Sequence, residues 1–326
     1  MNRRQALTRV LSLASAAALW PALGRAQEVW PSRPIRIIAP VSPGGGVDLV
    51  ARTMGERLGE VLGQTFIVEN QSGGGGLIAS QTVTRAAPDG YTLMLAYVGT
   101  HGTNPAVRKL PYDAVKGFTA IGMVGGTPNV LVVSPETPVT SVKELVAYAK
   151  AHPNELSYGS SGAGTLTHLV MEQFKEATQT TMTHVPYRGI APAIMDMLGN
   201  HTQVMFPGLA AALAQIKGGK LRALAVTGAR RHPLLPETPT MEELGFAGFD
   251  GVQWYGIMGP PNMPPEIVTR LNTEINKLIT SPELKERLSG EALETMPMSP
   301  AEFSDYVKKD IAKWSALVAA RKLEMD

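Results

Sequence analysis

The sequence contains no cysteine among its 326 residues. This absence excludes disulfide bonds, thiolate zinc sites, iron–sulfur clusters and cysteine nucleophiles together. The six histidines are scattered along the chain, with neither an HExxH motif nor the spacing of paired metal ligands. We therefore expect no metal site and no cofactor, and any chemistry must use oxygen, nitrogen or backbone groups.

A long apolar run and a basic stripe are also missing. Residues 27–326 contain no apolar stretch of 18 or more, so no membrane-spanning helix is predicted there. Four of the 30 Lys and Arg residues precede residue 27, which leaves 26 against 28 Asp and Glu. Because no basic stripe is interleaved with aromatic residues, we expect no nucleic-acid binding.

The first 26 residues have the pattern of an export signal. Three arginines precede a short apolar segment, residues 10–19, and small residues occupy positions 24 and 26. Such a segment is too short to span a bilayer. We predict an export signal peptide over residues 1–26, cleaved after Ala26, with an uncleaved membrane anchor as the alternative. The arginine pair fits the twin-arginine motif only in part, so the Sec and twin-arginine routes both stay open.

From Ile35 onward, short apolar runs alternate with glycine-rich turns and amphipathic helical patterns. The first unit has a strand at 35–39, a turn at 43–46 and a helix that ends at Gly63. A second series of strands and helices runs from residue 156 to residue 226. This alternation predicts an α/β protein with two units and mostly parallel sheets, followed by a helical C-terminal third.

The two units are not separated by a linker, which indicates a chain that crosses between two lobes more than once. The natural crossings are residues 119–133 and 249–258. We therefore assign residues 27–126 and 251–326 to lobe 1, and residues 127–250 to lobe 2.

The loop at residues 42–48 is the first candidate site, because it joins a strand to a helix. Its glycines let the backbone approach a ligand, and a helix start offers free N–H groups to an anion. It matches neither the G-x-G-x-x-G fingerprint nor a Walker loop. Two interpretations stay open: an anion site, or a tight turn in which Asp48 only complements the helix dipole. The candidate ligand-binding residues are Ser42, Pro43, Gly44, Gly45 and Asp48.

The segment at residues 157–165 repeats this arrangement in the second unit. Two facing anion sites of this kind would suit a ligand with two carboxylates. The alternative is ordinary helix capping by Ser161 or Thr165. The candidate ligand-binding residues here are Ser160, Ser161, Gly164, Thr165 and His168.

Two further loops follow strand ends. In the loop at 183–189, Tyr187 would pack on an organic ligand, and Arg188 would pair with a carboxylate or form a structural ion pair. The loop at 99–105 contains the candidates Thr100 and His101. Ligands in open α/β sheets lie beyond the carboxyl ends of strands, so this loop belongs to the same region.

A different function is compatible with the second loop. Residues 159–163 nearly fit the G-x-S-x-G pattern of a nucleophile elbow, with Ser161 as the nucleophile. The last position is alanine, however, and the partners Asp196 and His201 or His232 carry no local signature. We expect a protein that is not an enzyme. A secreted serine hydrolase that uses Ser161 stays open as the alternative.

Several short motifs follow one another along nearly the whole mature chain. They are WPSRPIRII at 30–38, PGGGVD at 43–48, PDGYTL at 88–93, VPYRG at 185–189, GKLRALAVT at 219–227, LPETPT at 235–240 and WYG at 254–256. Together they closely resemble the Bug family, the extracytoplasmic solute receptors of tripartite tricarboxylate transporters.

This resemblance implies a type II periplasmic-binding-protein fold, in which crossing strands join two α/β lobes and the ligand lies in the cleft between them. It implies a receptor that captures a small carboxylate by hinge closure and delivers it to a membrane permease. The carboxylate would be a di- or tricarboxylate, an aromatic acid or an acidic amino acid. A sensor kinase is an alternative partner, and a monomer is expected.

The resemblance also implies that the two glycine-rich loops hold the ligand, with Tyr187 close by. The sequence departs from the family pattern at Val41, where an aromatic residue is frequent, and at Arg188, which replaces the usual lysine. A carboxylate at Asp48 would repel an anion, so a direct contact there favours a ligand with an ammonium group. A simple dicarboxylate would need a bridging water.

Overall fold

The computed structural model describes residues 30–290 and 292–323. The predicted signal peptide, residues 1–26, lies outside the described residues. The described residues from Arg33 onward form one compact unit, to which every element below belongs. Within the described ranges, no helix is long and apolar enough to cross a membrane.

The first sheet is mixed and has six strands. Its strands are β1 (Ile35–Ala39), β2 (Phe66–Asn70), β3 (Thr92–Tyr97), β4 (Thr119–Pro128), β10 (Val252–Gly259) and β11 (Glu294–Thr295). Their order is β11-β4-β10-β3-β1-β2. β1 is parallel to β2 and β3, whereas β10 is antiparallel to β3 and β4, and β11 is antiparallel to β4. We call the part of the chain built on this sheet the first lobe.

The second sheet is also mixed and forms the basis of the second lobe. Its strands are β5 (Val130–Val133), β6 (Ser157–Ser160), β7 (Thr183–Pro186), β8 (Val204–Met205) and β9 (Arg222–Val226). Their order is β7-β6-β8-β5-β9, with β6 parallel to its neighbours and β5 antiparallel to its neighbours. The prediction of mostly parallel sheets was therefore wrong, because β10 in the first sheet and β5 in the second run antiparallel to both of their neighbours.

The helices follow the predicted alternation closely. In the first lobe they are α2 (Gly46–Leu62), α3 (Leu77–Thr84), α4 (Asn104–Val107), α9 (Pro265–Thr280), α10 (Pro282–Ser289) and α11 (Pro300–Arg321). In the second lobe they are α5 (Val142–Ala151), α6 (Leu166–Thr178), α7 (Ile190–Leu198) and α8 (Leu209–Lys217). A π-helical turn, η1 (Gly99–Thr103), precedes α4, where the sequence pattern predicts a loop.

Local signals explain where these helices begin and end. α2 buries Met54 and Leu58 on its apolar face and ends at Gly63, whose left-handed backbone lets its N–H bond to the carbonyl of Gly59. α11 begins with a capping box in which Ser299 and Glu302 satisfy each other's backbone amides.

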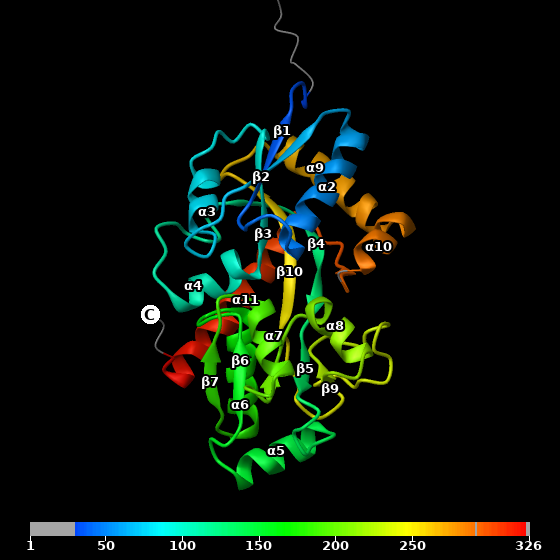
Figure 1. Cartoon of the computed structure of the whole chain (residues 1–326). Coiled ribbons are helices and arrows are strands. Elements are labelled where there is room, and N and C mark those ends of the chain that lie inside the picture. Colours follow the sequence, from blue (N-terminus) through cyan, green and yellow to red (C-terminus); the bar gives the residue numbers. More distant parts are fainter. Residues whose placement is uncertain (1–29, 291, 324–326) are drawn as a thin grey trace, which may run out of the picture. The chain divides into compact units, whose positions relative to one another are not determined.

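Two strands carry the chain between the lobes. β4 and β10 pair side by side along their length, and Figure 1 shows them running from one sheet toward the other. Just beyond β4, the amide of Asn129 donates to the carbonyl of Gly251 at 3.3 Å and to Oγ1 of Thr227 at 2.9 Å. The type II fold expected from the sequence, with two α/β lobes joined by crossing strands, is confirmed.

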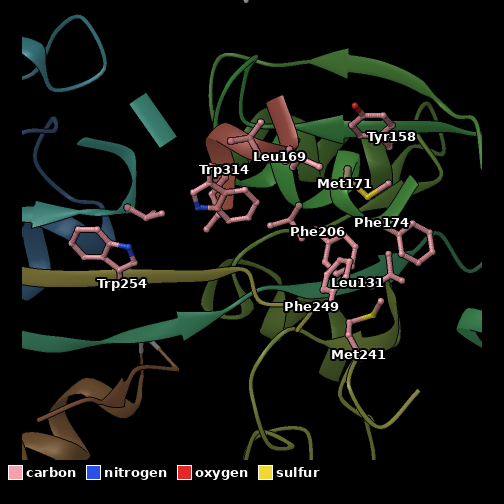
Figure 2. Packing of buried hydrophobic residues seen from close by; sticks show 14 of the residues in the cluster. Leu131, Tyr158, Leu169, Met171, Phe174, Phe206, Met241, Phe249, Trp254 and Trp314 are labelled. Carbon is pink, nitrogen blue, oxygen red and sulfur yellow. The ribbon is translucent and has the colours of Figure 1, made fainter. Parts of the chain in front are cut away.

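A single cluster of buried apolar side chains extends across this junction. Trp254 of β10 and Trp314 of α11 lie at the first-lobe end of the view in Figure 2, and Phe206 and Phe249 of the second lobe lie beyond them. The indole N–H of Trp254 donates to the buried carboxylate of Asp310 at 2.8 Å. Burial raises the pKa of Asp310, although Lys313 lies close by. The core therefore continues through the crossing strands.

Gly256 of β10 provides a test of this packing. A Cβ atom at this position would lie 2.8 Å from Cε1 of the Phe303 ring and closer still to Cζ, and the ring has no room to retreat because Phe303 is fully buried. We expect Gly256→Ala to lower the free energy of unfolding by about 1–3 kcal/mol, measured by urea denaturation.

Gly290, at the end of α10, is the matched control. A Cβ atom there would meet no atom within 4 Å, so Gly290→Ala should change stability by no more than about 0.5 kcal/mol. Equal losses in the two variants would show that contact with Phe303 does not constrain β10.

Candidate functional site

A cavity of about 190 Å³ lies between the loop before α6 and the segment that follows β3. The second lobe contributes Ser161 and residues 164–167 to its lining. The first lobe contributes Gly75, the end of β3, parts of η1 and α4, and Arg108. Gln253 of the crossing strand β10 completes the lining. Because both lobes and a crossing strand line it, this interlobe cavity is the candidate ligand-binding site.

The charge in the interlobe cavity is positive. Among the described residues that line it, Arg108 carries the one charged side chain. Arg108 is exposed as a residue, and its guanidinium makes no hydrogen bond or ion pair with another described residue. Tyr97 lies in the same lining, and burial raises the pKa of its phenol, so the hydroxyl stays protonated and can donate. The cavity therefore favours an anion.

The start of α6 adds a second positive pole. No side chain in the described structure caps this helix at Thr165. The amides of Leu166 and Thr167 have no acceptor among the described residues, and both residues line the cavity. Free amides at a helix start attract anions through hydrogen bonding and the helix dipole. The second predicted loop is thus placed at the cavity.

Hydroxyl groups shape this loop from within. Oγ of Ser161 lies 3.1 Å from Oγ1 of Thr165 and 2.9 Å from Oγ1 of Thr167, and Thr167 also accepts the amide of Ser161. Thr165 donates to the carbonyl of Gly162 at 2.7 Å. Of the predicted second-lobe contacts, Ser161, Gly164 and Thr165 line the cavity.

Ser160 and His168 lie beneath the loop and do not line the cavity. Both are buried, and the amide of Gly164 donates to Nδ1 of His168 at 3.1 Å. Oγ of Ser160 lies 2.7 Å from Nε2 of His184, whose ring stacks on that of His168 at a centroid distance of 4.0 Å. These two residues therefore contact the loop from beneath, outside the lining of the cavity.

The first predicted loop, residues 42–48, is not part of the cavity lining. Asp48 is buried and accepts hydrogen bonds from the amide of Gly44 at 2.9 Å and from Asn70 at 2.7 Å, and it pairs with Arg52 at 3.0 Å. Burial alone would raise the pKa of Asp48, but these partners lower it. The arrangement fits the tight-turn interpretation. Ser42, Pro43 and Gly45 lie in the same turn, outside the lining.

Three other predicted residues, Thr100, His101 and Tyr187, also lie outside the lining of the cavity. Thr100 and His101 are fully buried, and burial lowers the pKa of His101 to about 3. The His101 ring packs edge-on against Phe118 at 4.4 Å, so it is a core residue. The hydroxyl of Tyr187 donates to Asp196 at 2.6 Å, and burial together with this bond raises its pKa to about 12.

Sequence reasoning missed most of the first-lobe lining. Asn104 donates from Nδ2 to the carbonyl of Gly75 at 2.8 Å and so ties two lining segments together. Arg108 lies three residues beyond the loop at 99–105, and a cation so close to a strand end is the sequence signal for it. Gln253 carried no local signal, because its place depends on where β10 enters the sheet.

Comparisons with known proteins identify relatives along the whole fold. Residues 50–323 match the family model described as "Tripartite tricarboxylate transporter family receptor". Protein BugT of Bordetella pertussis is 32% identical over 294 residues, which cover 89% of this chain and 90% of BugT.

Solved structures agree with the family match. The structure of R. palustris Rpa4515 with adipate has a TM-score of 0.79 and 36% identity, and covers 89% of this chain and 97% of that one. The periplasmic binding protein BugD has a TM-score of 0.76 and 32% identity, covering 91% of this chain and all of BugD. The resemblance to the Bug family is confirmed, and the chain belongs to the tripartite tricarboxylate transporter receptor family.

Proposed function

We propose that this chain is a periplasmic receptor that binds a small dicarboxylate in the interlobe cavity and delivers it to a membrane permease. The observation that carries the proposal is the charge of that cavity. An unpaired guanidinium from one lobe and the free start of a helix from the other line the same space, and no described lining residue is acidic.

Each pole has a physical reason to bind a carboxylate. The guanidinium of Arg108 can pair with a carboxylate through two parallel hydrogen bonds. At the other pole, the amides of Leu166 and Thr167 offer donors, and a helix start stabilises a nearby anion by about 0.3–2 kcal/mol. Because the poles come from different lobes, a ligand with a carboxylate at each end would contact both lobes at once.

The size of the cavity favours a small acid. Its volume of about 190 Å³ lies below the roughly 300–1,000 Å³ of pockets that hold drug-sized ligands. The relative Rpa4515 was solved with adipate, an unbranched dicarboxylate. Asp48 is occupied by Gly44, Arg52 and Asn70, so it gives no reason to prefer a ligand with an ammonium group.

Ligand capture by hinge closure fits the same geometry. The lining includes Gln253 of β10, a strand that crosses between the lobes, together with residues from both sides of the crossing. A ligand that bridges the lobes binds the closed arrangement better than an open one, and so shifts the population toward it.

The hydrolase alternative gains no support from this geometry. The hydroxyl of Ser161 lies against those of Thr165 and Thr167. Nδ1 of His201 lies 3.5 Å from Asp196, but the described contacts of Ser161 include neither residue. A nucleophilic serine needs a base within hydrogen-bond reach.

Ligand-induced stabilisation tests the proposal directly. Residues 27–326, unfolded and refolded to remove any bound ligand, should melt at a higher temperature with adipate or succinate. At a ligand concentration 100 times Kd, stability rises by about 2.7 kcal/mol, which is roughly 5 °C in Tm. A folded protein that responds to no carboxylate would refute the assignment, and covalent labelling of Ser161 by a fluorophosphonate would favour the hydrolase.

Arg108 provides the sharper test of ligand class. Arg108→Met should weaken adipate binding by about 10- to 100-fold in titration calorimetry, because hydrogen bonds to charged groups contribute about 1.5–3 kcal/mol. The Tm of the ligand-free protein should stay unchanged, since Arg108 has no described side-chain partner. Arg85→Met, an exposed arginine outside the lining, is the control and should bind adipate as the unaltered protein does. Equal binding by both variants would remove Arg108 from the site.

A further inference from the structure

Two stacked imidazole rings lie directly beneath the loop that forms the second-lobe side of the interlobe cavity. The rings of His168 and His184 are nearly parallel, at 5°, with centroids 4.0 Å apart. Tyr158 extends the stack, with its ring 4.8 Å from that of His184. None of these three residues lines the cavity.

The two rings hold opposite ends of the loop. Nε2 of His184 lies 2.7 Å from Oγ of Ser160, where β6 ends, and Nδ1 of His168 accepts the amide of Gly164 at 3.1 Å. Within this loop, Gly162 and Gly164 adopt positive φ values of 130° and 73°. Glycine backbones lose much conformational entropy when they are fixed, so the loop needs anchors to keep one shape.

The hydrogen bond from Gly164 determines the protonation of His168. Nδ1 accepts a hydrogen bond, so a neutral ring carries its proton on Nε2, which lies 4.0 Å from Oε1 of Glu172. Burial lowers the pKa of His168, and the ring is therefore neutral at neutral pH and able to accept.

Glu172 fixes the far side of the ring. Its carboxylate accepts from the hydroxyl of Tyr158 and from Nζ of Lys175, each at 2.5 Å, and pairs with Arg321 of α11 at 3.0 Å. Glu172 is itself almost fully buried, so these partners are held in one arrangement. Glu172, held by these partners, thus fixes the orientation of the His168 ring.

We propose that His168 is a positioning residue, whose Nδ1 holds the Gly164 amide and thereby fixes the loop in its anion-binding shape. The inference rests on the proposed function, because the anion is the carboxylate of that ligand. A loop that is already in its bound shape loses less entropy when the ligand arrives, so the anchor raises affinity without touching the ligand.

A pair of substitutions separates this role from simple packing. His168→Ala removes the acceptor, whereas the side-chain oxygen of His168→Asn can take the place of Nδ1. By calorimetry, His168→Ala should weaken adipate binding about three- to tenfold, the effect of one neutral hydrogen bond. His168→Asn should bind within about twofold of the unaltered protein.

His232 is the matched control. It is also buried, and its Nδ1 also accepts a backbone amide, that of Leu234, at 3.2 Å, but it lies outside the lining of the interlobe cavity. His232→Ala should lower Tm and leave the adipate affinity unchanged. The proposal is overturned if His168→Ala binds adipate normally, or if His168→Asn binds as weakly as His168→Ala.

Hydrogen exchange of the Gly164 amide tests the anchor independently of any ligand. The exchange should be at least about tenfold faster in His168→Ala than in the unaltered protein or in His168→Asn. If the unaltered protein binds no carboxylate, the proposed function fails while this measurement still decides whether His168 holds the loop. Unchanged exchange in His168→Ala would refute the anchor.

The same rings predict how stability depends on pH. Burial, together with the neighbouring His168, lowers the pKa of His184 to about 4, and burial lowers that of His168. A histidine whose folded pKa lies below its unfolded value of about 6.5 stabilises the fold fully above pH 6.5, and this contribution is lost as the pH falls toward 4.

The charged groups around His168 do not account for a change of stability between pH 6.5 and 4.5. The groups that face His168 are Tyr158, Glu172, Lys175 and His184. Burial alone would raise the pKa of Glu172, but hydrogen bonds from Lys175 and Tyr158 lower it. The contribution of Glu172 to the stability of the fold is therefore lost only at pH values below the ordinary pKa range of a glutamate.

In urea denaturation, stability should fall less between pH 6.5 and 4.5 in His168→Asn than in the unaltered protein. Parallel curves would contradict a buried, neutral His168.

Discussion

The crossing of the chain on two adjacent strands is the constraint on which the rest of the structure depends. β4 and β10 are hydrogen-bonded neighbours. Other parts of the chain pack closely on both strands, so there is little space for side chains. Glycine meets this demand at two points: a Cβ atom at Gly125 would collide with the carbonyl of Glu294, and one at Gly256 would collide with Phe303. Successive residues of a strand face opposite sides. Val252 and Gln253 accordingly line different cavities, and only Gln253 reaches the interlobe cavity.

α11 links this crossing to the second lobe through two buried carboxylates. Asp310 accepts the indole N–H of Trp254 on β10, and Arg321, a few turns later, pairs with Glu172 of α6. Buried ion pairs add little net stability, because desolvation offsets much of the attraction, but removing one partner is costly. An arrangement that separated either carboxylate from its partner would therefore be costly. These pairs align α6, whose first turn lines the cavity, with a helix that also packs on the first lobe.

Features that depend on neighbouring residues could be predicted from the sequence, and features that depend on distant ones could not. The strand at 35–39, the helix end at Gly63 and the strand–loop–helix at 157–165 are local patterns, and the structure contains them. The insertion of β10 between β3 and β4 is not local, and it makes the sheet mixed. Asp48 looked like a ligand contact because its partner Asn70 comes from another strand. His101 is likewise covered by Phe118, and no sequence motif predicts this contact.

The two sides of the interlobe cavity differ in how firmly they are held, and this difference bears on ligand selection. On the second-lobe side, the backbone amides of Leu166 and Thr167 line the cavity, and hydroxyls and imidazoles make hydrogen bonds to the loop from beneath. Backbone amides recognise a carboxylate without regard to the rest of the molecule. On the first-lobe side, Arg108 is exposed and unpaired among the described residues, so its position depends on what it binds. If the proposed function holds, the rigid side captures one carboxylate of any small acid. The side chains of Arg108 and Gln253 then discriminate among acids by the length and charge of the remainder.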